Sequence, residues 1–172
     1  MFRKFDYAVN LIAEPFGNLK YRNRTALILL KDSQGRFILG TSGFYPDGIV
    51  RMIGGGIDEG EELIVGAIRE IKEEIGISAT PEELVELAMI SISGEYKGET
   101  YTTIIYVYFL DSDEDDYLAG DDVTEIIRLT EEQYRDLVKR FFALDSASWR
   151  DYGQVYGFVH QVALEEYLEK NI

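Results

Sequence analysis

Cysteine is absent from the 172-residue sequence, and histidine occurs once, as His160. Without cysteine the chain has no disulfide scaffold, no thiolate nucleophile and no zinc site with cysteine ligands. His160 falls within a helical pattern near the C-terminus, where we expect a packing residue rather than a catalytic base. Thiol chemistry is therefore excluded, and histidine chemistry has no support.

Long apolar runs are also missing. No stretch is apolar over the length that a bilayer-spanning helix requires. The N-terminal stretch "MFRKFDYAVNLIAEPF" contains acidic residues and lacks the apolar core of a signal peptide. We therefore expect a cytoplasmic protein that does not enter a membrane.

Basic residues are scarce. The chain has 17 lysines and arginines against 32 aspartates and glutamates, which gives a formal net charge of -15. This balance disfavours binding to a nucleic-acid duplex or to an anionic membrane surface. An anionic small substrate would be repelled as well, unless a metal cation reversed the local field. We expect a small-molecule substrate as the partner.

The pattern of apolar residues predicts one mixed domain. Hydrophobic residues make up 46% of the chain, and no repeat or low-complexity linker divides residues 1–172. Strands are predicted in the N-terminal segment 1–22 and in "TALILLK" (25–31), the latter buried on both faces. Further strands precede and follow a central helix, and helices end the chain, the last over 148–172. This order favours an α/β (α+β) domain with a mixed sheet flanked by helices.

The central helix is predicted from Glu62 to Ile75, with Gly76 as a left-handed C-terminal cap. Three carboxylates crowd onto this helix at Glu70, Glu73 and Glu74. Neighbouring like charges repel, but a hard divalent cation such as Mg²⁺ binds several carboxylates and removes the repulsion. The glycines of 54–56 would let the backbone approach a ligand or metal closely.

Nine residues at fixed spacing extend this pattern. They are Gly55, Glu61, Arg69, Glu70, Ile71, Glu73, Glu74, Gly76 and Ile77. The string matches every fixed position of G-x5-E-x7-R-E-U-x-E-E-x-G-U, with U aliphatic, and so resembles the signature of the Nudix hydrolase family. A solvated acidic face would explain the glutamates alone, but not the spacing of Gly55, Glu61 and Gly76.

The resemblance implies a fold and an activity. The fold would be the Nudix α/β/α sandwich around a mixed sheet. The activity would be hydrolysis of a pyrophosphate bond in a nucleoside diphosphate linked to another group, with Mg²⁺ or Mn²⁺ as cofactor. Glu70, Glu73 and Glu74 would bind metal, together with the backbone carbonyl of Gly54. Glu61 and Arg69 would form the pair that orders the loop and helix.

The resemblance leaves the general base and one further acidic ligand open. The base would be Glu70 or an acid on a later loop. Glu99, Asp121 and Asp122 are candidates for that acid, and Asp122 is preferred because it lies just before a predicted strand. Ile53 stands where many family members have proline, and we expect only a modest change in loop stiffness.

Substrate contacts are predicted from residues near the motif. Phe44 and Tyr45 could stack on a base, Arg51 could meet a phosphate, and Gly55 allows a close approach. The markers that distinguish subfamilies are ambiguous: Ser91 stands where ADP-ribose hydrolases often have proline, and Tyr96 lies later than the tyrosine of dinucleoside polyphosphate hydrolases. The nucleotide substrate stays open at this point.

A second class of function is a nucleotide-binding or regulatory module that keeps the fold without turnover. Such modules usually lose a carboxylate of the motif, and none is missing here. Members of the family often form dimers, so a homodimer is a further expectation.

Overall fold

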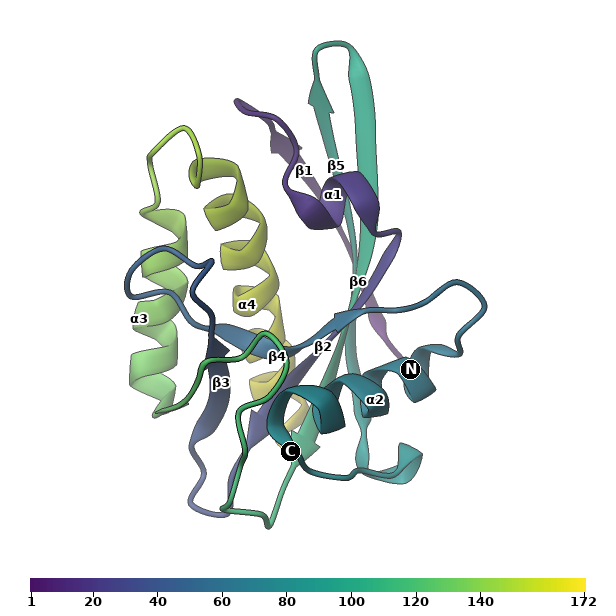
Figure 1. Ribbon diagram of the computed structural model, residues 1–172, viewed down its shortest axis with the longest axis vertical. Helices are drawn as coiled ribbons and strands as arrows, with labels where there is room; N and C mark the ends of the chain where they lie inside the picture. The colour runs from purple at the N-terminus through teal and green to yellow at the C-terminus, as the bar shows by residue number, and fades with distance from the viewer.

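The computed structural model describes all residues, 1–172. Figure 1 shows one sheet with helices on both of its sides. The strands are β1 (Arg3–Asn10), β2 (Arg24–Lys31), β3 (Phe37–Thr41), β4 (Arg51–Gly56), β5 (Val85–Tyr96), β6 (Glu99–Asp111) and β7 (Glu125–Leu129). The helices are α1 (Gly17–Tyr21), α2 (Leu63–Ile75), α3 (Glu131–Phe142), α4 (Arg150–Lys170) and the 3₁₀ turn η1 (Pro81–Glu83).

The seven strands form a single mixed sheet in the order β1-β5-β6-β2-β4-β3-β7. The β1–β5 and β2–β6 pairs are parallel, and the remaining pairs are antiparallel. Helices α3 and α4 lie on one side of the sheet and α2 on the other (Figure 1). The expected α+β sandwich is confirmed.

Strand β2 contributes to both cores, as its continuous apolar run predicts. Leu27 and Leu29 belong to the larger core, which includes α3 and α4, while Ile28 and Leu30 belong to the smaller core under α2. Alternate residues of a strand point to opposite faces, so a strand covered on both sides needs apolar residues throughout. This strand and its neighbour β4 therefore fix the position of α2 relative to the rest of the domain.

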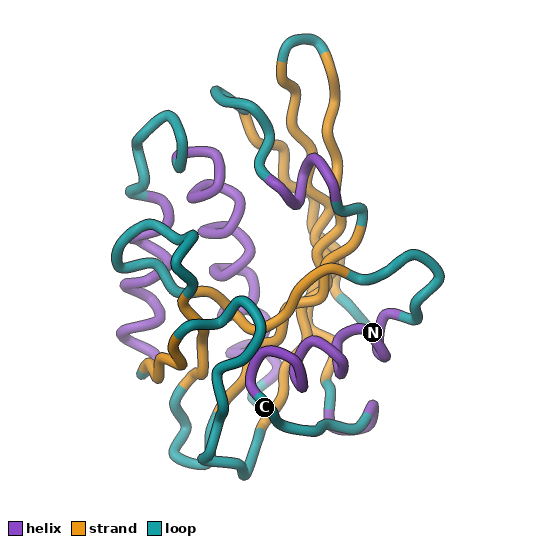
Figure 2. Tube along the Cα trace, viewed as in Figure 1, coloured by secondary structure: helices purple, strands orange, loops and turns teal.

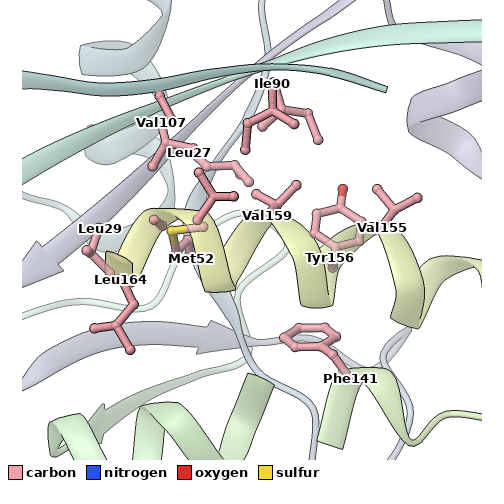
Figure 3. Packing of buried hydrophobic residues seen from close by; sticks show 14 of the residues in the cluster. Leu27, Leu29, Met52, Ile90, Val107, Phe141, Val155, Tyr156, Val159 and Leu164 are labelled. Atoms are coloured by element: carbon pink, nitrogen blue, oxygen red, sulfur yellow. The ribbon is translucent and has the colours of Figure 1, made fainter. Parts of the chain in front are cut away.

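The C-terminal helix α4 lies between the sheet and α3. Figure 3 shows Val155, Tyr156 and Val159 of α4 facing the sheet residues, with Phe141 of α3 on the other side. Two glycines, Gly153 and Gly157, in the first half of α4 weaken its sequence pattern, and the structure explains the first of them. A Cβ at Gly153 would lie 2.2 Å from the carbonyl oxygen of Phe141, so the close contact with α3 requires glycine there.

The N-terminal segment 1–22 is not purely extended, which corrects the prediction of a strand segment. After β1 the chain forms the short helix α1, visible in Figure 2 as an isolated turn of helix beside the strands. Five residues are too few to show a helical period in the sequence. Tertiary contacts stabilise it, because Asn18 and Leu19 are buried and α1 packs against β6.

None of the helices is both long and apolar enough to cross a membrane.

Gly54 is the tightest contact between β4 and β2, and we predict that Gly54→Ala destabilises the fold. Its φ is +133°, and an added Cβ would lie 2.1 Å from the carbonyl oxygen of Ala26. Backbone strain and this clash should lower the free energy of unfolding by at least about 2 kcal/mol, measured by urea denaturation. Gly43→Ala is the matched control, because a Cβ added at Gly43 would have no heavy atom within 4 Å. Equal losses in the two variants would contradict this account.

Candidate active site

The glycine-rich end of β4 and helix α2 bracket a short loop, residues 57–62, and together they form the site. Gly76 adopts the left-handed conformation at φ +76°, and its N–H donates to the carbonyl oxygen of Lys72. The predicted helix end is therefore confirmed. Helix α2 packs on β2 and β4 through its apolar face. The edge of this face carries glutamates and lies beside the glycines of β4.

Arg69 connects the loop to the helix. Its guanidinium binds Glu61 through two hydrogen bonds, from Nε to Oε1 (2.9 Å) and from Nη2 to Oε2 (3.0 Å). Nη2 also donates to the carbonyl oxygen of Gly56 (3.1 Å). Nη1 donates to Glu70 (2.8 Å) and to Glu73 (2.9 Å). One cation thus holds three carboxylates and the end of β4.

Further hydrogen bonds hold the loop 57–62 together around Glu61. Oε2 of Glu61 accepts the backbone N–H of Asp58 (3.0 Å), and Arg24 donates to the carbonyl oxygens of Asp58 and Glu61. The hydrogen bonds from Arg69, followed by that of Asp58, lower the pKa of Glu61 to about 2. Gly66 makes room for this carboxylate, since a Cβ there would lie 2.7 Å from Oε2. The predicted role of Glu61 and Arg69 as an ordering pair fits these contacts.

Glu70 and Glu74 face the glycines. A Cβ at Gly55 would lie 2.5 Å from Oε2 of Glu70, so this carboxylate occupies the space that glycine leaves. The backbone N–H of Gly54 donates to Oε2 of Glu74 (2.7 Å). Gly54 was expected to contribute its carbonyl oxygen, and the observed contact to Glu74 uses its N–H instead.

Both carboxylates line a pocket of about 690 Å³. The pocket also brings together the other predicted binding residues, which come from β4, the β3–β4 loop and the β6–β7 loop. They are Phe44, Tyr45, Arg51, Gly54, Gly55 and Asp122. Asp121 lines it as well, whereas Glu99 binds the hydroxyl of Tyr101 and is not among the lining residues. A volume of this size suits a small-molecule ligand.

Glu73 does not line this pocket with Glu70 and Glu74. Its side chain is 44% exposed and pairs with Arg69. In this conformation no three acidic or histidine side chains are close enough to one another to hold a single metal ion. The predicted three-carboxylate cluster is therefore present as a pair, Glu70 and Glu74, with Glu73 outside the pocket.

Arg51 lies at the wall of the pocket close to two aromatic rings. Its guanidinium carbon is 5.3 Å from the ring centre of Tyr45 and 5.0 Å from that of Tyr156. Nη1 donates to the hydroxyl of Tyr156 (3.1 Å), and this hydroxyl also accepts a hydrogen bond from the side-chain amide of Asn18. Nε of Arg51 is buried without a partner, and no carboxylate forms an ion pair with this arginine. A partly buried cation in this condition suits an anionic ligand.

Comparison with known proteins decides the family. The NUDIX domain profile matches residues 21–153, which is most of the chain. The chain belongs to the Nudix family.

Relatives agree with this assignment. The RNA pyrophosphohydrolase of Novosphingobium aromaticivorans is 30% identical over 148 residues, covering 74% of this chain and 89% of that protein. The Escherichia coli dihydroneopterin triphosphate pyrophosphohydrolase is similar in fold, with a TM-score of 0.56 at 17% identity over 80% of this chain and 97% of the other. A MutT/nudix family protein from Enterococcus faecalis gives a TM-score of 0.51 at 19% identity over 67% of this chain, which spans only 46% of that protein. The expected enzyme class, a Nudix pyrophosphohydrolase, is confirmed.

Nudix hydrolases generally use divalent cations, and the donor set of this member suits one. Glu70 and Glu74 present carboxylate oxygens at the pocket, and Gly55 leaves room for the carboxylate of Glu70. Hard cations prefer such oxygen ligands, and the pocket lining contains neither thiol nor imidazole. Burial raises the pKa of Glu70, and burial raises the pKa of Glu74 to about 7. Buried carboxyl groups with raised pKa values are typical of functional sites.

Sequence reasoning missed several residues of this Nudix site, including four polar or aromatic side chains at or beside the pocket. Asn18, Tyr21 and Arg22 come from α1 and the turn after it, and Tyr156 comes from α4. Tyr156 touches Arg51 across 105 residues of sequence, so no local pattern could have connected them. The unrecognised short helix α1 concealed the other three.

Glu74 and Glu61 should give this Nudix hydrolase opposite pH dependences. The pKa of Glu74 is raised from 4.5 to about 7, so between these pH values the folded protein keeps a proton that the unfolded chain has lost. The free energy of unfolding therefore falls as the pH rises through this window, by up to about 3 kcal/mol. Glu61 acts in the other direction, because its lowered pKa stabilises the fold above pH 4.5 and this contribution is lost as the pH falls towards 2.

Urea denaturation in the presence of a chelator tests the Glu74 prediction. The difference in free energy of unfolding between the wild type and Glu74→Gln should change steadily from about pH 4.5 to about pH 7, with the wild type losing stability. A difference that is constant across this window would contradict the prediction.

Proposed function

We propose that this Nudix hydrolase cleaves a pyrophosphate bond in a nucleoside diphosphate linked to another group, with Mg²⁺ or Mn²⁺ as cofactor. The observation that supports the proposal most directly is the single pocket lined by Glu70, Glu74 and Arg51. Carboxylates for a cation and an arginine for a phosphate are the groups that anhydride hydrolysis needs.

Each residue has a proposed role. Glu70 and Glu74 would hold the cation, and the carbonyl oxygen of Gly54 and the carboxylate of Glu73, which pairs with Arg69 here, would be its further ligands. The bound cation would neutralise the phosphate oxygens and lower the pKa of a water. Oε2 of Glu70 faces Gly55 and has no hydrogen bond from the protein, whereas Oε1 accepts from Arg69. We assign Oε2 as the acceptor of the proton from the attacking water.

The substrate contacts divide between charge and stacking. Arg51 would bind a phosphate, held in place by its contacts with the rings of Tyr45 and Tyr156. Tyr45 is therefore a positioning residue for Arg51 rather than a platform for a base. Phe44 is 77% exposed at the pocket and is the better candidate for stacking on the base. Asp122, with Asp121, would supply the acid from the later loop.

A substrate panel tests the reaction. Purified protein is incubated with nucleoside triphosphates, nucleotide sugars, ADP-ribose, dinucleoside polyphosphates and a 5′-triphosphorylated RNA oligonucleotide, with Mg²⁺ or Mn²⁺, and products are separated by chromatography. The RNA is included because one relative is named an RNA pyrophosphohydrolase. Hydrolysis at a phosphate anhydride supports the proposal, and silence across the panel refutes it.

Glu74→Gln and Glu73→Gln should each lower kcat by orders of magnitude while the protein stays folded. The amide keeps the shape of the side chain but loses the charge that binds a cation. The matched control is Glu62→Gln, an exposed acid at the N-terminal end of the same helix whose side chain makes no capping hydrogen bond. Steady-state kinetics at saturating Mg²⁺ and circular dichroism measure the two effects. Either variant within a few-fold of the wild type would argue against its proposed role.

A further inference from the structure

A second pocket adjoins the first. It has a volume of about 560 Å³ and lies between the turn after α1 and the loop after β4. Four residues line both pockets: Tyr21, Arg22, Gly56 and Glu70. The two volumes therefore meet beside the carboxylate that we assign as the proton acceptor. Each of them lies within the range of ~300–1,000 Å³ that is usual for small-molecule sites.

Arginines without a carboxylate partner are concentrated at these two pockets. Six of the ten arginines pair with carboxylates, and the other four do not. These four are Arg22, Arg24, Arg51 and Arg140. In a chain of net charge -15, an arginine readily finds an acid, yet three of the four line the two pockets. Arg22 is exposed and makes no side-chain hydrogen bond, whereas Arg24 donates to two loop carbonyls.

Exposed aromatic rings are also concentrated at these two pockets. Among all tyrosines, phenylalanines and the tryptophan, only Tyr21 and Phe44 are exposed, each at 77%. Phe44 lines the first pocket, and Tyr21 lines the border and the second pocket. Exposed rings of this kind offer a stacking surface to a planar base. Each side of Glu70 therefore has one exposed ring and at least one arginine without a carboxylate partner.

We propose that the two pockets bind one substrate with a nucleotide unit on each side of its phosphate chain, a dinucleoside polyphosphate, and that Arg22 and Tyr21 form the subsite for the second unit. This inference rests on the proposed function, because it places the scissile phosphates beside Glu70. The second pocket also contains Asp58 and Glu59, so it is not basic as a whole. Arg22 is then the cation of this pocket whose donors are free to bind an anionic unit, because Arg24 already donates to two loop carbonyls.

A longer nucleic acid fits the surface less well. The chain as a whole has a formal net charge of -15, so a long polyanion would be repelled more strongly than a short substrate. A dinucleoside polyphosphate ends with its second base, and Tyr21 can stack on that base. The test therefore compares an RNA oligonucleotide with a dinucleoside polyphosphate as substrates.

Arg22→Ala and Arg140→Ala form a matched pair. Both remove one exposed arginine without a carboxylate partner, but Arg140 lies on α3 and lines neither pocket. For a dinucleoside tetraphosphate, Arg22→Ala should raise KM about tenfold or more, and for a nucleoside triphosphate by a clearly smaller factor. Tyr21→Ala should show the same preference, and Tyr21→Phe should restore the wild-type KM because the ring is kept. Equal KM values for the Arg22 and Arg140 variants would overturn the proposal, as would equal effects on the two substrates.

Binding is measured as well, so that the subsite can fail independently of the reaction. Calorimetry with a methylene-bridged dinucleoside tetraphosphate and Mg²⁺ should give a Kd about tenfold weaker for Arg22→Ala than for Arg140→Ala. If no phosphate anhydride is hydrolysed but this difference is found, the proposed reaction fails and the subsite stands. If anhydrides are hydrolysed and the difference is absent, the subsite fails. A higher kcat/KM on the 5′-triphosphorylated oligonucleotide than on the dinucleotide would also overturn the proposal.

Discussion

The guanidinium of Arg69 is the interaction on which the site depends. It binds Glu61 on the loop, Glu70 and Glu73 on α2, and the carbonyl oxygen of Gly56 at the end of β4. Without this cation, three carboxylates at close range would repel one another and the loop would lose its attachment to the helix. Its planar group with several donors at fixed angles explains why arginine is present, since lysine offers a single point of charge. Because the side chains of Arg69, Glu61 and Glu70 are all less than a third exposed, solvent screens these contacts only in part.

The second constraint is steric. Two glycines leave space beside the backbone that a Cβ atom would fill. Gly54 allows β4 to lie against β2, and Gly55 leaves room for the carboxylate of Glu70. These neighbouring glycines have different tasks: the first contact is with backbone, which cannot yield, and the second is with the end of a side chain, which can. The spacing of glycine and glutamate in the motif therefore reflects a steric fit between a strand and the helix that follows it.

The local part of the site could be predicted from the sequence, and the distant part could not. Arg69, Glu61 and the glutamates of α2 lie within one loop and one helix, so their spacing determines which of them meet. The helix end at Gly76 and the doubly buried strand β2 followed from the same kind of pattern. Glu73 shows the limit of this reasoning: its position on the helix was correct, but Arg69 draws its carboxylate away from the pocket. Arg51 shows the other limit, because its environment comes from Tyr156 on α4, and how α4 packs against the sheet is not specified by a single sequence.

The charge of the chain and the composition of the pockets explain each other. An acidic surface repels phosphates at a distance, so recognition of an anionic substrate must be confined to a small region. In the proposed function Arg51 and Arg22 would provide this locally, and neither forms an ion pair with an acid of the chain. Glu70 and Glu74 line the same pocket and would repel an anion when charged, and their burial favours the protonated form. In the proposed reaction, substrate and cation would therefore depend on each other, because the arginines alone would be too few to hold a polyphosphate beside two carboxylates and a bound cation would offset that repulsion.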